Sequence, residues 1–248
     1  MKTTVTDRYR YIALYLLFSL LLCSLLSLML IVGYKTNEKD RSKSADAEPK
    51  GDVLPVVVID AGHGGEDGGT VGQNGAYEKD INLSIALMLS DMLRANGIET
   101  VLTRSDDILL YDKNSNYHGQ KKIQDLATRR KIAESYENAV FVSIHMNSFP
   151  EEKYSGLQVY YSKNDESSKF LAESIQSLTK EKLLPDNTRK CKAADSNIYL
   201  LDRLSCPAIL VECGFLSNPQ ECARLSDSTY QKQLALCLCK ALTEYVAK

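Results

Sequence analysis

The sequence predicts an α/β fold: a single mixed, mostly parallel sheet flanked by helices on both faces, preceded by one N-terminal transmembrane helix. Apolar runs of strand length alternate along the chain with segments of helical period, which is typical of a largely parallel sheet covered on both sides. Separately, residues 11–33 carry no charge and are rich in Leu, which is enough apolar chain to cross a membrane.

The chain of 248 residues is expected to have four parts. Residues 1–10 are an N-terminal cytoplasmic segment and residues 11–33 a transmembrane anchor. The apolar stretch is longer than that of a cleaved signal peptide, and the Ala-x-Ala at 45–47 lies well downstream, so an uncleaved anchor is favoured. Residues 34–52 are polar and charged, as in a linker. Residues 53–248 are the folded domain.

The first half of this domain is predicted to hold three strands and two helices. Each strand is an apolar run of suitable length. The first helix repeats apolar residues on one face and ends at an Asn-Gly pair, a frequent helix terminus. The second helix is basic and amphipathic. In order, these elements are a strand at 53–59, a helix at 79–96, a strand at 98–103, a helix at 126–136 and a strand at 139–144.

The second half is predicted to hold two strands and two helices. Residues 156–161 alternate in polarity as a strand does, and residues 208–211 read as a short buried strand. Residues 167–184 form a helix that stops before a proline, and residues 230–246 a terminal helix. Within the first half, the loop at 105–124 is long for a compact domain, and such loops often line a functional groove.

Charge and cysteine content argue against a nucleic-acid-binding protein and against a zinc site made of thiolates. The formal net charge is −2 and no basic patch occurs, so nucleic acid is not an expected partner. Six of the seven cysteines follow residue 190, and none forms a Cys-x-x-Cys pair, which argues against a thiolate zinc site. Buried free thiols are expected, with a disulfide as the alternative.

Four residues stand at or just after predicted buried strands, or in the loop that follows one: His63, Glu78, His145 and Glu212. The carboxyl ends of strands in an open α/β sheet are where sites form. Two imidazoles and a carboxylate there suit a catalytic zinc ion, and a second carboxylate suits its base. Glu78 also has a purely structural explanation, as a first-turn acid that favours the helix dipole. Glu212 follows an apolar run, so its carboxylate is expected to be partly desolvated and to need a partner.

The glycine-rich loop at 60–69 is not a dinucleotide site. The fingerprint needs a third glycine where this chain has Asp67, and the next helix opens too late. We expect the glycines to let the backbone turn sharply and to leave room around the imidazole of His63. Asp60 either orients that imidazole or caps the turn.

Five segments, in order along the whole domain, resemble the zinc-dependent N-acetylmuramoyl-L-alanine amidases of the type 3 family. They are Val-Ile-Asp-Ala-Gly-His-Gly-Gly at 58–65, Glu-Lys-Asp-Ile-Asn-Leu at 78–83, Val-Leu-Thr-Arg at 101–104, Phe-Val-Ser-Ile-His-Met-Asn-Ser at 141–148 and Ile-Leu-Val-Glu-Cys-Gly-Phe-Leu-Ser-Asn-Pro at 209–219. The short anchor and the absence of wall-binding repeats resemble the membrane-anchored spore-cortex and germination branch of that family.

The resemblance implies that residues 53–248 are a zinc amidase catalytic domain, in which His63, Glu78 and His145 hold one Zn²⁺ per chain and Glu212 is catalytic. The bond implied joins N-acetylmuramic acid to L-alanine of the stem peptide in peptidoglycan. In the spore-cortex branch, this cleavage lets muramic δ-lactam form. Two further residues, Asn147 and Arg129, are predicted as substrate contacts.

The implied partners are peptidoglycan glycan strands with their stem peptides, the membrane through the N-terminal helix, and an activating protein. The expected location is a single-pass protein of the cytoplasmic membrane with its catalytic domain on the extracytoplasmic side. A count of Lys and Arg around the anchor would favour the opposite orientation, although long domains translocate largely regardless of charge. Two rival functions are a membrane-tethered, non-catalytic cell-wall-binding protein and a zinc peptidase acting within the stem peptide.

Overall fold

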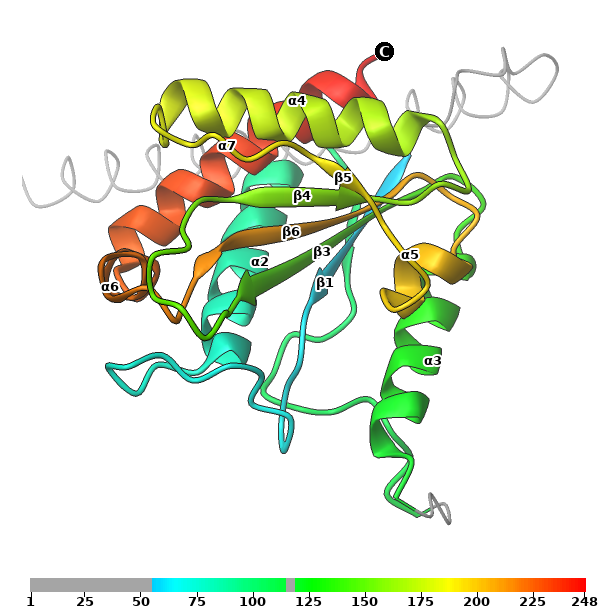
Figure 1. The fold of residues 1–248 in the computed structure, drawn as a ribbon. Helices are drawn as coiled ribbons and strands as arrows, with labels where there is room; N and C mark the ends of the chain where they lie inside the picture. The colour runs from blue at the N-terminus through cyan, green and yellow to red at the C-terminus, as the bar shows by residue number, and fades with distance from the viewer. Residues whose placement is uncertain (1–54, 115–118) are drawn as a thin grey trace, which may run out of the picture. The chain divides into compact units, whose positions relative to one another are not determined.

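A six-stranded mixed sheet runs through the part of the chain that the computed structural model describes, residues 55–114 and 119–248 (Figure 1). Its strand order is β2-β1-β3-β6-β4-β5. The first four strands in this order are parallel, whereas β4 is antiparallel to β6 and parallel to β5. The prediction of a mixed, mostly parallel sheet is therefore confirmed. The strands are β1 (Val56–Ala61), β2 (Thr100–Leu102), β3 (Ala139–Asn147), β4 (Gln158–Tyr161), β5 (Lys192–Ala193) and β6 (Ala208–Phe215).

Helices pack on both faces of this sheet, and each face has its own apolar core. Alternate residues of the strands feed the two cores: Val57 and Ile59 belong to the first, and Val58 to the second. Helices α2, α4 and α7 supply the first core, and α3 and α5 the second. The helices are α2 (Glu78–Ala95), α3 (Lys121–Glu134), α4 (Ser167–Lys182), α5 (Tyr199–Arg203), α6 (Pro219–Leu225) and α7 (Ser228–Val246).

Three short elements are absent from the sequence prediction: β5, α5 and α6. They have two, five and seven residues, too few for a hydrophobic period to show. Helix α3 also begins at Lys121 rather than at 126, so the long loop before it is shorter than predicted. Its first turn carries little apolar pattern, and the prediction missed it for that reason.

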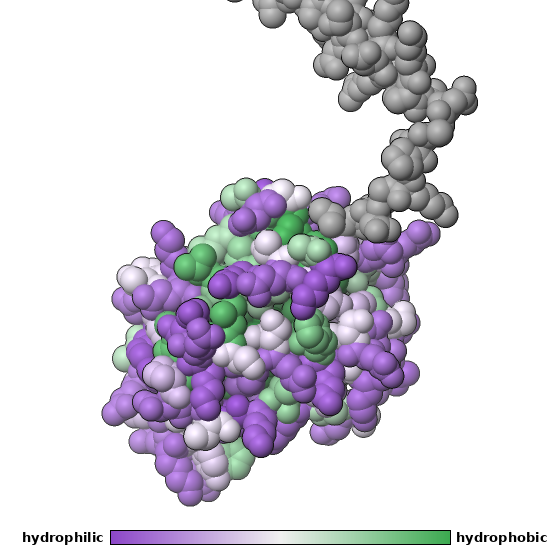
Figure 2. Space-filling model, turned by 90° about the horizontal axis from the view of Figure 1, so that it is seen from above, coloured by the Kyte–Doolittle hydropathy of each residue, from purple (hydrophilic) through white to green (hydrophobic). Residues whose placement is uncertain are grey.

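The outer face formed by α4 and α7 is an ordinary solvated surface. Figure 2 shows apolar residues scattered among hydrophilic ones on the side seen from above. Phe170 on α4 and Leu236 on α7 are 47% and 59% exposed. The six cysteines in the described residues are free thiols as predicted, but only Cys213, Cys222 and Cys239 are also buried.

The predicted segments at 1–10, 11–33 and 34–52 lie outside the described residues. Within residues 55–114 and 119–248, no helix is both long and apolar enough to span a bilayer.

The sheet brings the ends of three parallel strands to one edge. Ala61 at the end of β1 pairs with Ile144 of β3, and His145 of β3 pairs with Glu212 of β6. The loop that carries His63 leaves β1 at the same edge. Candidate residues far apart in the sequence are thereby gathered at the carboxyl ends of the strands, where open α/β sheets form their sites.

Candidate metal centre and neighbouring carboxylate

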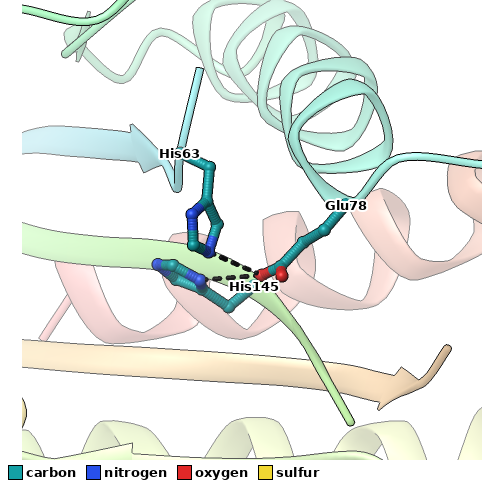
Figure 3. Close-up of side chains that lie close together, drawn as sticks. All are labelled: His63, Glu78 and His145. Atoms are coloured by element: carbon teal, nitrogen blue, oxygen red, sulfur yellow. Dashed lines mark hydrogen bonds and ion pairs between the residues drawn. The ribbon is translucent and has the colours of Figure 1, made fainter. Parts of the chain in front are cut away.

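Three of the predicted residues converge at this edge of the sheet. His63 comes from the loop after β1, Glu78 is the first residue of α2, and His145 lies near the end of β3 (Figure 3). Their ligand atoms all lie within 4.8 Å of one another. The structure thus brings together the two imidazoles and the carboxylate that the sequence predicts as a metal-binding set.

The spacing of these atoms suits a tetrahedral metal ion. His63 Nε2 lies 3.2 Å from Glu78 Oε1, and His145 Nδ1 lies 2.9 Å from the same oxygen. Zinc bonds of about 2.0–2.2 Å in tetrahedral geometry separate ligand atoms by roughly 3.3 Å. Two nitrogens and one carboxylate are also a usual donor set for catalytic zinc, with a further position left for water. The residues present therefore fit such an ion.

The Glu78 carboxylate is fixed by the backbone as well as by the two rings. Its Oε2 accepts a hydrogen bond from Thr70 N at 2.9 Å, and its Oε1 accepts one from Met146 N at 3.0 Å. Burial raises the pKa of Glu78, but hydrogen bonds and charge from His145 and His63 outweigh burial and hold the pKa well below its ordinary value. The group is therefore an anion already oriented toward the two imidazoles.

Two glycines make room for the ligands. A Cβ on Gly62 would lie 2.3 Å from the imidazole of His145, and a Cβ on Gly69 would lie 2.5 Å from Glu78 Oε2. Gly69 also has φ of +65°, which favours glycine. The interpretation of the glycine-rich loop as space around an imidazole is confirmed, with His145 as well as His63 benefiting.

His63 itself has a strained backbone, with φ of 61°, and it is the sole non-glycine residue with positive φ in the described ranges. Its Nδ1 lies 2.9 Å from Asp67 Oδ1, although the two atoms are not aligned as a hydrogen bond. Sequence reasoning missed Asp67. The signal was its position four residues after His63 within one tight loop. Asp60 does not orient the ring, because its carboxylate accepts hydrogen bonds from Thr103 and Ser143 instead.

Arg129 holds the backbone of the His63 loop from inside the domain. Its guanidinium donates to the carbonyl oxygens of Ala61 and His63, each at 2.7 Å, and pairs with Asp60 at 2.7 Å and Asp125 at 2.8 Å. The side chain is 1% exposed. This burial contradicts the prediction that Arg129 contacts the substrate, because the side chain offers no surface to a ligand.

Arg104 is a second buried guanidinium that sequence reasoning left unassigned. It donates to the carbonyl oxygens of Ala61 and Gly62, and to that of Lys79 at the start of α2. The loop of His63 and the helix of Glu78 are therefore tied together by one side chain. The signal was the Val-Leu-Thr-Arg segment at 101–104, since a charged residue directly after a strand needs buried partners.

Glu212 lies beside the three candidate ligands and is not a member of that group. It pairs in register with His145 on the adjacent parallel strand, so the two side chains share one face of the sheet. The residue is half-buried, and its Oε2 is shielded from solvent with no hydrogen-bond partner. Burial raises the pKa of Glu212 to about 7, against the opposing charge of His145 and with the added effect of Glu78. A carboxyl group with such a pKa can take up and release a proton near neutrality.

Asn147 ends β3, two residues beyond His145 on the same strand face. It is half-buried, and its Oδ1 accepts a hydrogen bond from Ser148 N at 2.8 Å. Its contact with substrate stays a prediction.

A mixed α/β sheet with three converging side chains that could hold a metal ion, and a separate carboxylate beside them, is the arrangement of a hydrolase of α/β fold. The family follows from sequence comparison. Residues 57–244 match the Amidase_3 model, N-acetylmuramoyl-L-alanine amidase, and the chain belongs to that family. It is accordingly an enzyme that cleaves peptidoglycan as an N-acetylmuramoyl-L-alanine amidase.

Named relatives support this assignment. The germination-specific N-acetylmuramoyl-L-alanine amidase of Bacillus subtilis is 33% identical over 194 residues, which cover 77% of this chain and 79% of that protein. The CwlD amidase of Clostridioides difficile, solved in complex with the GerS lipoprotein, superposes with a TM-score of 0.74 at 39% identity, covering 78% of this chain and 98% of that one. AmiC2 of Nostoc punctiforme superposes with a TM-score of 0.66 at 32% identity, covering 78% and 98% of the two chains.

Proposed function

We propose that this amidase is zinc-dependent, with His63, Glu78 and His145 holding one Zn²⁺ per chain and Glu212 acting as the catalytic base. The observation that carries the proposal is the convergence of three ligand atoms within 4.8 Å, beside a carboxylate that has an unpartnered, shielded oxygen. A binding protein without catalysis would have no use for a desolvated carboxylate at that position, because such a group costs stability.

The chemistry divides between the ion and the chain. When bound, zinc would lower the pKa of a water molecule and polarise the carbonyl group under attack. Glu212 then accepts a proton from the attacking water and delivers one to the departing amine. The bond cut is the amide between the lactyl group of N-acetylmuramic acid and L-alanine of the stem peptide. Glu78 and the two imidazoles need not move, since their backbone and neighbours already hold them in position.

The zinc proposal predicts that metal removal abolishes peptide release. The full chain, purified in detergent, is expected to contain about one zinc per chain. Treatment with a chelator should stop the release of stem peptides from muropeptides, and added zinc should restore it. Mass spectrometry of the products identifies the bond: a free L-alanine amino terminus supports an amidase. A cut within the stem peptide would show a zinc peptidase, and no cut at all would favour a non-catalytic wall-binding protein.

The assignment of the zinc ligands is tested by a substitution at one of them. His145→Ala is expected to lose zinc and activity together, because two ligands hold the ion far less well than three. Retention of a full zinc complement by a His63→Ala, His145→Ala double variant would contradict the ligand assignment.

We also propose a single-pass protein of the cytoplasmic membrane, anchored by residues 11–33, with the amidase domain outside. The uncharged apolar stretch supports the anchor, and a peptidoglycan substrate supports the outward orientation. Protease added to intact spheroplasts is expected to digest residues 53–248. Protection of the domain until the membrane is broken would show the opposite orientation.

The proposed setting is the spore cortex, where removal of stem peptides precedes formation of muramic δ-lactam. Similarity to the germination-specific amidase of Bacillus subtilis supports this role, and the CwlD complex with a lipoprotein supports an activating protein partner. Spores of the producing organism without this chain are expected to have cortex that lacks muramic δ-lactam. Normal lactam content in their digested cortex would contradict the role.

A further inference from the structure

A row of side chains extends across three strands from the candidate metal centre. His145 on β3 is the register partner of Glu212 on β6, and Glu212 is the register partner of Gln158 on β4. Directly opposed residues on neighbouring strands share one face of the sheet, and strands lie about 4.8 Å apart. Gln158 therefore stands on the far side of Glu212 from the metal ligands, roughly 10 Å across the sheet from His145.

A β-bulge adds an aromatic ring to the same face. His145 and Asn147 are two residues apart on β3, but their partners Glu212 and Phe215 are three residues apart on β6, and the register shifts between them. The extra residue on β6 reverses the alternation of its side chains. Phe215 is thus brought to the face that carries His145, Glu212 and Gln158.

Arg189 is held against this row by neutral groups. Its Nη1 donates to Gln158 Oε1 at 2.8 Å, and its Nε donates to Ser155 O at 2.8 Å. Its Cζ lies 4.4 Å from the centre of the Phe215 ring. Gln158 is in turn fixed, because its Nε2 donates to Lys190 O at 2.8 Å. The guanidinium is therefore oriented in advance, although the side chain is only half-buried.

Arg189 forms no ion pair with a carboxylate of the described residues, although its charge acts on Glu212. Among residues 55–114 and 119–248, no carboxylate lies within ion-pair distance of Arg189, whereas Arg130, Arg203 and Arg224 each face one. A planar guanidinium that lies over an aromatic ring and forms no ion pair is well suited to bind an incoming carboxylate through paired N–H donors.

The position of Glu212 decides which part of the substrate Arg189 meets. If Glu212 delivers a proton to the departing amine, as proposed above, the peptide side of the scissile amide must lie toward Glu212. Arg189 stands beyond Glu212, so it faces the peptide and not the sugar. An extended chain advances about 3.3–3.6 Å per residue, so a cation at this distance meets the residues that directly follow L-alanine.

We propose that Arg189 is a specificity-determining residue that binds the free carboxylate of the second stem-peptide residue. Phe215 and Gln158 are its positioning residues. This inference rests on the proposed role of Glu212 and on the proposed direction of the leaving peptide, and it names the feature of the stem peptide that the enzyme selects.

Two substrates that differ at one group test this assignment. Muropeptides are prepared with the carboxyl group of the second stem residue either free or amidated, and kcat and KM are measured for each. The wild-type chain is expected to prefer the free acid, and Arg189→Met should raise KM for it by about 10- to 100-fold, the usual effect of losing a hydrogen-bonded charge pair. Its kcat/KM for the amidated substrate should change little, and Arg189→Lys should recover part of the preference.

The matched control is Arg203→Met, since Arg203 also lies over an aromatic ring, that of Tyr199 at 6.0 Å, but has an acid neighbour. It is expected to leave both substrates unaffected. Equal losses on both substrates in Arg189→Met would overturn the inference and leave Arg189 a merely structural residue.

A binding measurement separates this inference from the amidase mechanism. The dipeptides L-Ala-D-Glu and L-Ala-D-isoglutamine are titrated calorimetrically into the zinc-loaded chain, which requires no turnover. The assignment is supported if the wild-type chain binds L-Ala-D-Glu more tightly than L-Ala-D-isoglutamine and this difference disappears in Arg189→Met. That outcome supports it even if the proposed base proves wrong. Equal affinities for the two dipeptides in the wild-type chain would refute it, whatever the activity.

Discussion

Glu212→Gln is expected to lower kcat by about 10²–10⁴-fold while zinc content stays at its wild-type level. The glutamine keeps the shape of the side chain but accepts no proton, and loss of a positioned general base has effects of this size. Zinc should be retained because Glu212 is not among the three residues proposed to hold the ion. Steady-state hydrolysis of muropeptides, with metal analysis of the same samples, measures both quantities. Wild-type kcat in this variant would exclude Glu212 as the base.

The same variant has a second expected effect, on stability. The Glu212 pKa of about 7 lies above that of an unfolded glutamate, so ionisation of this group in the metal-free protein opposes folding as pH rises from about 4 to 7. Glu212→Gln removes this penalty, and the metal-free variant should resist urea better than wild type at pH 8 but not at pH 4.

The contrast variant is Glu221→Gln. That glutamate is buried, and its carboxylate accepts hydrogen bonds from Gly156 N and Phe215 N. Its replacement should lower the free energy of unfolding. A fall in stability for Glu212→Gln at pH 8 would show that its carboxylate has a stabilising partner after all.

The sequence predicted part of the fold and of the candidate site. Apolar runs predicted the strands, and residues at strand ends predicted His63, His145 and Glu212, because a parallel sheet gathers those ends at one edge. Glu78 was undecided from spacing alone, because a first-turn acid and a metal ligand look the same in sequence. Only tertiary contacts distinguish them: the two imidazoles and the amide of Met146 all meet its carboxylate.

The misses share one physical cause. Arg129 lies on a helix that reads as basic and solvated, and its burial depends on Asp60, which is distant in sequence. Asp67 approaches His63 only because the loop turns back on itself. Phe215 reaches the site face only through a bulge. Each depends on the path of the backbone rather than on a local pattern, so no hydrophobic period signals it.

Arg129→Met is expected to lower the free energy of unfolding by about 3–5 kcal/mol, the usual cost of removing one partner of a buried ion pair. The change leaves Asp60 and Asp125 without their countercharge, and it leaves the carbonyl oxygens of Ala61 and His63 without a donor. Urea unfolding followed by circular dichroism, with chelator present so that metal affinity plays no part, measures this loss. Arg130→Met is the matched control.

Arg130 is the next residue of the same helix, and its pair with Glu134 is exposed, so its loss should lower the free energy of unfolding far less than the loss of Arg129. Similar losses in the two variants would show that the Arg129 network contributes no more than a surface pair.

The pH dependence of the stability loss in Arg129→Met identifies its physical cause. Burial raises the pKa of Asp60, but the charge of Arg129 and hydrogen bonds from Ser143 and Thr103 outweigh burial, so the folded-state pKa lies below its ordinary value. Asp60 therefore stabilises wild type above about pH 4, and this contribution is lost as pH falls through the lowered pKa. In Arg129→Met, Asp60 stays buried without the cation, so its ionised carboxylate opposes folding. Protonation of Asp60 at low pH removes this penalty. The stability gap between variant and wild type should accordingly narrow as pH falls from 7 to 4 and below. A gap that stays constant over this range would mean that lost packing of the guanidinium, rather than an uncompensated charge, accounts for the destabilisation.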